Sequence, residues 1–299
     1  MVNLNTQKAL FSIGLSAFGK LGTVLKNTDY LPQKPIYFLS LLKLAYSKQK
    51  SNQGFVDELL KDQALKLKLL TLSGSQNLTA NASKNDFVTA VHNLENNLIE
   101  NMIELELVNK YTNAIGSRLT ESKQRNWKRC IKSAVIAKAV SQWVNYESPE
   151  IAFMSALLQD LPEAVLSIND TSSSILVDQK IANGVGKKEA QISVLGYDAA
   201  ELGSKLFKYY TMPAEMVDLV QNDFDATRVK SKNMKLCQIV AFSSYIANCF
   251  SDKSQSPSSI WGQAQKSMQD LGLEVSLEQW GNKISLLFVK TLEFEMSVK

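Results

Sequence analysis

Few residues of this chain could hold a catalytic metal ion, and the most suggestive are Gln159 and Asp160. They follow the apolar run Ala156-Leu157-Leu158 and precede Leu161-Pro162. With histidine in place of Gln159, the sequence would read Leu-Leu-His-Asp, a familiar metal-binding motif on a helix. The chain has a single histidine, His92, in 299 residues. A site built from several imidazoles therefore cannot exist in this chain.

The composition favours a helical protein. Hydrophobic residues make up 45% of the chain, and there are only 13 glycines and 6 prolines. Scarce turn residues combined with much Leu, Ala, Lys and Gln favour helix over a turn-rich β fold. We predict an all-α protein. The net charge of +4 is spread along the chain, so it leaves an anionic partner open but does not by itself indicate nucleic-acid binding.

The cysteines are too few and too scattered for a disulfide framework or a zinc site. Each lies in a stretch with a helical pattern, so we interpret them as small core residues. This usage fits a reducing cytosol. The three are Cys130, Cys237 and Cys249.

Residues 1–27 have the pattern of an amphipathic helix. One stripe of it consists of Phe11, Leu15, Phe18, Leu21 and Leu25, at steps of three and four residues, which is helical spacing. Lysines interrupt any stretch long enough to cross a bilayer. We expect this helix to pack on its own protein, with docking on a membrane surface or a partner as the alternative.

Capping residues and a glycine divide the rest of the chain. Asp62 is expected to cap one helix, and Asp198 with Glu201 has the spacing of a capping box. The longest amphipathic pattern opens at Asp86 and predicts one helix over 86–111. Gly116 interrupts the pattern, so we divide the chain into an N-terminal helical part, 28–118, and a helical bundle with C-terminal helices, 119–299.

The segment Gly184-Val185-Gly186-Lys187-Lys188 has some likeness to a phosphate-binding loop. It lacks the spacing and the hydroxyl residue of GxxxxGK[ST], which supply the phosphate cradle and a magnesium ligand. We interpret it as a surface turn.

Two sections of the chain resemble the HD-related output domain (HDOD) family, regulatory proteins of bacteria descended from HD phosphohydrolases. The first, Leu31 to Ser75, is similar to the family's Leu-Pro opening and its Asp-Pro-x-Leu-x-x-Lys-Leu-Leu-x-Leu-Ala-Asn-Ser motif, with Gln63 at the proline. The second contains WKRC, SALLQD and LGYDAAELG, which resemble the family's Trp-x-His-Ser, Gly-Leu-Leu-His-Asp and Leu-Gly-x-Asp-His-Ala-Glu-x-Gly motifs. Together they cover most of residues 31–250. The resemblance implies an N-terminal helical subdomain packed with an HD-like bundle.

The resemblance also implies that the family's metal site has been lost. In HD enzymes, histidines and aspartates hold divalent metals that activate water for phosphoester hydrolysis. Of the matching positions, only Asp160 retains its acid; the others are Arg129, Gln159, Ala199 and, in the loosest part of the match, Ser244. A guanidinium, an amide, a methyl and a hydroxyl cannot replace imidazoles around a metal. We therefore expect no cofactor and no hydrolase activity.

Arg129 and Asp160 should approach each other, because their family counterparts bind a common metal. We predict that a guanidinium–carboxylate pair ties the two helices together in place of the metal, since a buried charge needs a partner. The alternative is that Arg129 points to solvent with Arg125 and Lys132, which share its helical stripe.

The leading functional hypothesis is a cytoplasmic, non-catalytic signalling module that contacts a protein partner in trans, with no membrane span. The alternative is a sensor that binds a nucleotide or another small ligand in the former catalytic cleft, where cations could contact phosphate. Its candidate ligand-binding residues are Lys128, Arg129, Lys132, Gln159 and Asp160. An enclosed polar pocket would favour the sensor, and a filled site would favour the signalling module.

Nucleic-acid binding is not favoured. Arg125, Trp127, Lys128, Arg129 and Lys132 are the only candidates for a basic face with an aromatic residue. Trp127 matches a core position of the family, so we expect it to be buried.

Overall fold

The computed structural model describes residues 21–32, 35–47, 53–74, 83–251 and 257–298. Within these ranges every regular element is a helix and there is no strand, which confirms the all-α prediction. Most of the amphipathic stripe predicted over residues 1–27 lies outside the described residues. At its end, residues 21–26 are helical and Leu21 is buried.

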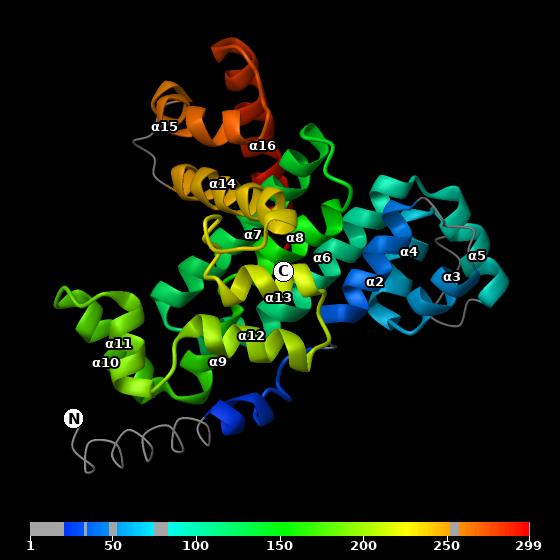
Figure 1. Ribbon diagram of the computed structural model, residues 1–299. Helices are drawn as coiled ribbons and strands as arrows, with labels where there is room; N and C mark the ends of the chain where they lie inside the picture. Colours follow the sequence, from blue (N-terminus) through cyan, green and yellow to red (C-terminus); the bar gives the residue numbers. More distant parts are fainter. Residues whose placement is uncertain (1–20, 33–34, 48–52, 75–82, 252–256, 299) are drawn as a thin grey trace, which may run out of the picture.

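The N-terminal helices form the right-hand part of the molecule in Figure 1. They are α2 (Pro35–Tyr46), α3 (Gln53–Leu60), α4 (Gln63–Leu72), α5 (Lys84–Asn93) and α6 (Asn96–Ile115). Phe38, Phe55 and Phe87 are completely buried between them. Asp62 caps α4 as predicted: its Oδ1 accepts hydrogen bonds from the backbone N–H groups of Ala64 and Leu65.

The single helix predicted over 86–111 is wrong, because the chain is interrupted between α5 and α6. Leu94 and Glu95 have extended backbone conformations. Leu94 is buried, but the next member of the predicted stripe, Leu98, is exposed and Ile99 is buried instead. The buried face of α6 is therefore offset from the predicted stripe, although both sets of apolar residues have helical spacing. The first of the two helices is capped by Ser83, in a capping box with Asp86.

The longest described helix, α7 (Glu121–Trp143), lies at the centre of the molecule. It packs most extensively on α8 (Pro149–Leu158) and α14 (Met234–Ser251), and also on α16 (Leu277–Ser297). Trp127 on α7 is buried, as expected, and its ring stacks on that of Tyr111. The structure therefore places α7 against α8, which ends just before Gln159 and Asp160, and against α14, which carries Ser244.

The remaining helices surround this centre. They are α9 (Leu161–Asn169), α10 (Thr171–Ala182), α11 (Lys187–Leu195), α12 (Ala199–Tyr209), α13 (Ala214–Gln221) and α15 (Pro257–Asp270). Figure 1 shows α10 and α11 at the lower left and α15 with α16 at the top. Asp198 caps α12 as predicted, since its Oδ1 accepts from the N–H of Glu201 at 2.8 Å.

Gly203 allows α12 to approach α9 and α13 closely. A Cβ atom at this position would lie 2.7 Å from Cγ of Pro162 and would also clash with Cγ2 of Val220. The absence of a side chain therefore determines the spacing of three helices around the candidate site.

A continuous hydrophobic core includes residues from both sides of the predicted division at 118/119. Cys130, Cys237 and Cys249 are buried cysteines without a disulfide bond, which agrees with their interpretation as core residues. Among the described residues, one segment, Pro149–Asn169, has the length and apolar composition of a membrane-crossing helix, and 78% of its most apolar window is buried inside the protein.

Candidate functional site

The predicted ion pair between Arg129 and Asp160 is present. Arg129 lies on α7 and Asp160 between α8 and α9, and Nη2 of the arginine donates a hydrogen bond to Oδ2 of the aspartate. Both side chains are only 23% exposed. Burial alone would lower the pKa of Arg129, but the Asp160 carboxylate outweighs this and raises it. The guanidinium is thus a permanent charge that joins α7 to the start of α9.

Gln159 and Ser244 belong to a chain of hydrogen bonds beside this pair. The Ser244 hydroxyl on α14 donates to Oε1 of Gln159 at 2.9 Å, and it lies 3.1 Å from the hydroxyl of Ser133 on α7. The amide nitrogen of Gln159 donates to the carbonyl of Ala156 at 2.8 Å. Sequence reasoning missed Ser133, although it lies one helical turn after Arg129 and so on the same face. These contacts connect α7, α8 and α14 through neutral groups.

Ala199 contributes no side-chain contact to the Arg129–Asp160 pair. It begins α12, and its backbone N–H donates to Oε1 of Gln191 at 3.1 Å. A cavity of about 70 Å³ adjoins it, lined among others by Lys187 and Asp223. The space beside Asp160 itself has a volume of only about 10 Å³. The sequence-predicted positions therefore surround a filled interior rather than an open cleft.

A second charged group, which sequence reasoning missed, lies next to the pair. Glu163 on α9 contacts Nζ of Lys187 and lies 3.6 Å from Nζ of Lys123. Burial alone would raise the pKa of Glu163, but Lys187 and then Lys123 outweigh it and hold the pKa below its ordinary value. Lys187 thus belongs to an ion-pair network, and the interpretation of its segment as a simple surface turn was incomplete.

This set of side chains does not fit a catalytic divalent metal. Asp160 is the one carboxylate at the five matched positions, and its Oδ2 is already engaged by a cation. Divalent metals at hydrolytic sites take imidazole or carboxylate ligands and leave a position for water. Among the described residues, no group of three His, Cys, Asp or Glu side chains is arranged to hold a metal ion.

The other predicted ligand-binding cations lie away from the pair. Nζ of Lys132 is 3.6 Å from the carboxylate of Glu295 on α16. Lys128 is exposed and lines a separate cavity of about 600 Å³ between α6, α7 and α16. The five residues predicted to bind a ligand together are therefore not gathered around one space.

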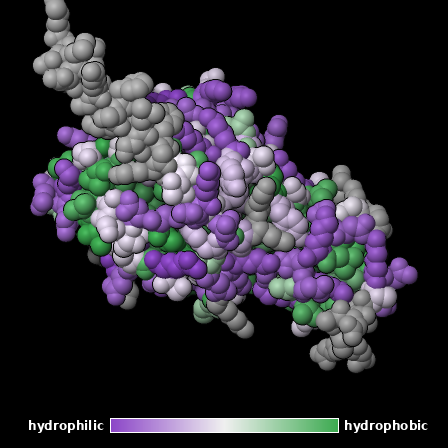
Figure 2. Space-filling view, turned by 90° about the horizontal axis from the view of Figure 1, so that it is seen from below, coloured by the Kyte–Doolittle hydropathy of each residue, from purple (hydrophilic) through white to green (hydrophobic). Residues whose placement is uncertain are grey.

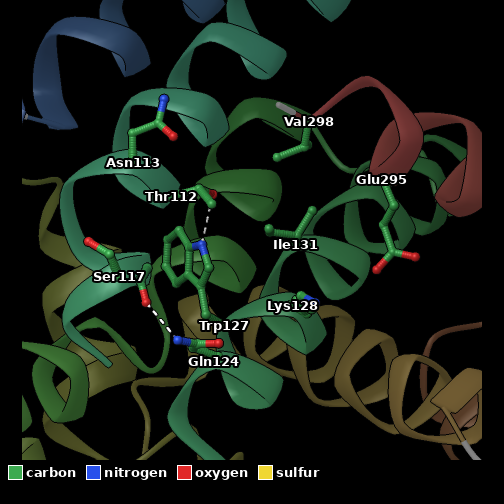
Figure 3. Close-up of a pocket in the computed structure, with 10 residues that line it drawn as sticks. Thr112, Asn113, Ser117, Gln124, Trp127, Lys128, Ile131, Glu295 and Val298 are labelled. Atoms are coloured by element: carbon green, nitrogen blue, oxygen red, sulfur yellow. Dashed lines mark hydrogen bonds between the residues drawn. The ribbon is translucent and has the colours of Figure 1, made fainter. Parts of the chain in front are cut away.

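Figure 3 shows the residues around this cavity. Trp127, Ile131 and Val298 supply apolar surface, with polar groups from Asn113 and Lys128. Two hydrogen-bond donors at its edge are already used: the Trp127 indole donates to Oγ1 of Thr112, and the Gln124 amide donates to the carbonyls of Gly116 and Leu119. The cavity is thus a partly apolar recess whose exposed cation is Lys128.

The residues that were the candidates for a basic face do not form a continuous one. Arg125 lies 3.8 Å from the carboxylate of Glu121, Arg129 is held by Asp160, and Lys132 faces Glu295. The aromatic residue of the group, Trp127, is buried. A nucleic-acid surface built on these residues would lack the exposed aromatic residue, and three of its four cations face carboxylates.

The fold is similar to several solved structures. A proposed phosphohydrolase from Shewanella amazonensis SB2B matches with a TM-score of 0.63 and 18% identity, over 92% of this chain and 98% of that one. An HDOD domain protein of unknown function from Geobacter sulfurreducens matches with a TM-score of 0.59 and 18% identity, over 93% and 96%. A proposed signal transduction protein from Marinobacter aquaeolei VT8 matches with a TM-score of 0.59 and 14% identity, over 95% of this chain and 65% of that one.

At these identities the likeness concerns the fold alone. No curated protein matches the sequence. The sequence itself matches the model of the HDOD domain over residues 31–225, a range that includes Arg129, Gln159, Asp160 and Ala199. The chain belongs to the HDOD domain family.

Proposed function

We propose that this protein is a non-catalytic regulatory module of bacterial, cytoplasmic signal transduction, which acts through contacts with a protein partner in trans. Membership of the HDOD family supports a regulatory role. The observation that carries the non-catalytic part is the Arg129–Asp160 ion pair. A fixed guanidinium at this position repels a divalent metal and also uses the carboxylate that would bind it.

The small volume of the former site supports the same proposal. The spaces beside Asp160 and Ala199 measure about 10 and 70 Å³, whereas sites for small molecules typically enclose about 300–1,000 Å³. Charges and hydrogen bonds in this interior are satisfied by other residues of the chain. The residues of the old site would then serve to hold α7, α8, α9 and α14 in place.

A surface for a partner is offered by α10 and α11. Ile175, Leu176, Ile181 and Ile192 are exposed large apolar residues on these two helices. Figure 2 shows hydrophobic residues among charged ones at the left end of the molecule, where these helices lie. Large apolar side chains exposed on a pair of helices at the end of the molecule are candidates for contact with a protein partner.

The test of the non-catalytic proposal combines metal analysis with an assay of hydrolysis. Purified protein would be examined for bound metals, and bis(p-nitrophenyl) phosphate would be offered with Mn²⁺ or Fe²⁺. We expect no metal in stoichiometric amount and no turnover above that of Asp160→Asn. Bound metal, or turnover that Asp160→Asn abolishes, would restore the enzyme hypothesis.

The partner would be sought by cross-linking in native cells. A photo-reactive residue would replace Leu176 in one variant and the exposed Leu67, on α4, in the other. We expect one specific adduct from position 176 that is absent from position 67. Adducts of equal yield at both positions would contradict the assignment of the partner surface to α10 and α11.

A ligand sensor is the second candidate, and the 600 Å³ cavity beside Lys128 favours it. This cavity would move the ligand from the former cleft to the space between α6, α7 and α16. Thermal shift with nucleotides tests the candidate, using Ile131→Trp to fill the cavity. A stabilisation that is lost in Ile131→Trp and kept in Asp160→Asn would place the ligand in this cavity. If no nucleotide shifts the melting temperature, the sensor candidate falls and only the protein-contact proposal remains.

A further inference from the structure

Helix α10 exposes large apolar side chains that its packing within the described chain does not use. It packs on α9 and α11, and its buried residues are Ser174 and Val177. At 3.6 residues per turn, Ile175 and Leu176 lie on the opposite side of the helix, where they are 47% and 51% exposed. These two residues, with the exposed Ile181 of α10 and Ile192 of α11, are called the α10–α11 surface below.

The chain that precedes Leu21 enters the described structure close to the start of α10. Residues 21–26 are helical, and Leu21 is buried. A few residues later the Tyr30 hydroxyl accepts a hydrogen bond at 3.0 Å from the side-chain nitrogen of Asn169, which ends α9, and α10 begins at Thr171. Figure 1 shows the helix of residues 21–26, in dark blue, below α9, with its first residue on the side of α10 and α11. Residues 1–20, which lie outside the described residues, are therefore attached at the end of the molecule that carries the α10–α11 surface.

The sequence of residues 1–20 predicts an element that suits this surface in length and polarity. The stripe of Phe11, Leu15 and Phe18 continues at a three-residue step to Leu21, and the burial of Leu21 shows that the described end of the stripe faces the protein. A helix of twenty residues is about 30 Å long, whereas α10, with 12 residues, is about 18 Å long. The predicted helix is thus long enough to lie along α10.

Covalent attachment favours this segment over a separate molecule as the occupant of the surface. A tethered segment is present at an effective concentration of about millimolar, so even a weak apolar contact forms within the chain. An anionic membrane is a poorer fit, because helices that lie on a membrane surface carry mainly Lys and Arg on their polar face. Between residues 1 and 20 the basic residues are Lys8 and Lys20, and the polar side of the pattern contains Ser12 and Ser16.

We propose that residues 1–20 form an amphipathic helix whose apolar stripe packs on the α10–α11 surface of the same chain. The helix then covers the surface assigned above to the protein partner, and the partner must displace it in order to bind. This regulatory consequence rests on the proposed function, whereas the contact within the chain does not. One contact thus accounts for both the N-terminal stripe and the exposed side chains of α10.

The rate at which a cysteine at position 176 reacts with a maleimide tests this contact in the full chain. The native cysteines are buried, so Leu176→Cys supplies the reactive thiol. We expect this thiol to react about tenfold or more faster when Leu15→Asp with Phe18→Asp removes the apolar stripe, since the helix then no longer covers it. An equal rate with and without these two changes would overturn the proposal.

Two matched controls separate loss of the contact from general effects of added charge. Ser12→Asp with Ser16→Asp places the same charges on the polar side of the pattern and should leave the rate at position 176 unchanged. Leu67→Cys labels an exposed leucine on α4, and its rate should be the same in every background. Binding of the full chain to phosphatidylserine vesicles that Leu15→Asp with Phe18→Asp abolishes, with no change of rate at position 176, would assign the stripe to a membrane and overturn the proposal.

Photo-crosslinking in native cells distinguishes failure of this proposal from failure of the proposed function. A link within the chain leaves the mass of the product unchanged, whereas an adduct with a partner raises it. We expect Leu15→Asp with Phe18→Asp to increase the yield of the heavier adduct from position 176. If the maleimide rate is unchanged but the heavier adduct forms, this inference falls and the proposed function stands. If the maleimide rate rises but no heavier adduct forms, the contact within the chain stands and the partner surface falls.

Discussion

At the scale of single residues, Arg129 and Asp160 satisfy each other's charge in an interior that offers each of them little water. Removing one partner leaves the other charge without compensation, and this costs roughly 3–5 kcal/mol for a fully buried pair. Both side chains retain 23% exposure, so water reduces the penalty. We expect Arg129→Met or Asp160→Asn alone to lower the free energy of unfolding by about 2–3 kcal/mol.

The double variant distinguishes a coupled pair from two independent residues. If the charges compensate each other, Arg129→Met combined with Asp160→Asn should cost little more than either change alone. Urea unfolding of the wild type, the two single variants and the double variant gives the four free energies of this double-mutant cycle. The control is Arg125→Met, which removes an exposed contact with Glu121 at 3.8 Å and should change stability by about 0.5 kcal/mol at most. Strictly additive costs for Arg129 and Asp160 would show that the pair is not coupled.

Glu163 makes a prediction about pH. Lys187 and Lys123 hold its pKa in the folded protein below the ordinary value despite burial. A group with a depressed pKa in the folded state stabilises the fold above its unfolded pKa and loses this contribution as pH falls through the folded pKa. The destabilisation caused by Glu163→Gln should therefore be constant near neutral pH and should shrink below about pH 4.3, the ordinary glutamate value.

Unfolding curves of wild type and Glu163→Gln, measured from neutral to acid pH, give this difference directly. Glu121→Gln is the matched control, because that side chain is 92% exposed and lies beside Arg125 at 3.8 Å. Its effect should be small at every pH. A penalty for Glu163→Gln that does not change with pH would contradict the role of its charge.

At the scale of elements, Gly203 sets how closely α12 approaches α9 and α13. An added Cβ would lie 2.7 Å from Cγ of Pro162 and would clash with Val220, so either the helices move apart or the ring shifts. Gly203→Ala should lower the free energy of unfolding by roughly 1–3 kcal/mol, as expected for overpacking. Gly281→Ala is the control on α16, where a Cβ meets nothing within 4 Å; its better helix propensity should stabilise by up to about 1 kcal/mol. Thermal unfolding of both variants checks the contrast, and an equal gain from both would refute the close approach.

How much of these elements the sequence predicts depends on where the determining contacts lie. The caps at Asp62 and Asp198 are confirmed, because a cap bonds to backbone within three residues. The break at Leu94 was missed, because this extended residue is buried and keeps the helical spacing of Phe87 and Val91. A local pattern records burial and not the conformation that produces it.

In the candidate site, too, some contacts could be predicted from the sequence and others could not. The Arg129–Asp160 pair could be predicted because the family resemblance relates two distant positions to one metal. Ser133 and Glu163 lie one turn beyond these two residues and could have been found from helical spacing. The contribution of Lys187 could not, because it reaches Glu163 from the start of α11 and only the packing of α9 against the α10–α11 segment brings the two together.

At the scale of the whole molecule, the division predicted at 118/119 can be tested by how the protein unfolds. Polar contacts cross it: the Trp127 indole on α7 donates to Thr112 on α6 at 2.9 Å. Glu104 on α6 accepts from the Tyr46 hydroxyl on α2 at 2.9 Å and pairs with Lys138 on α7 at 2.8 Å. With the hydrophobic core also continuous across this point, the two parts should stabilise each other.

We therefore predict a single cooperative unfolding transition in scanning calorimetry, with equal calorimetric and van't Hoff enthalpies. Phe38→Ala on α2 and Phe242→Ala on α14 each remove a large buried side chain and should cost roughly 3–5 kcal/mol. Because the parts unfold together, both variants should lower the midpoint of that same transition. Two transitions, of which Phe38→Ala shifts only one, would instead mean that the N-terminal helices fold as a separate unit. The candidate site, whose residues all lie beyond residue 118, would then stabilise only the bundle. In a cooperative molecule, by contrast, the Arg129–Asp160 pair contributes to the stability of every helix, α2 included.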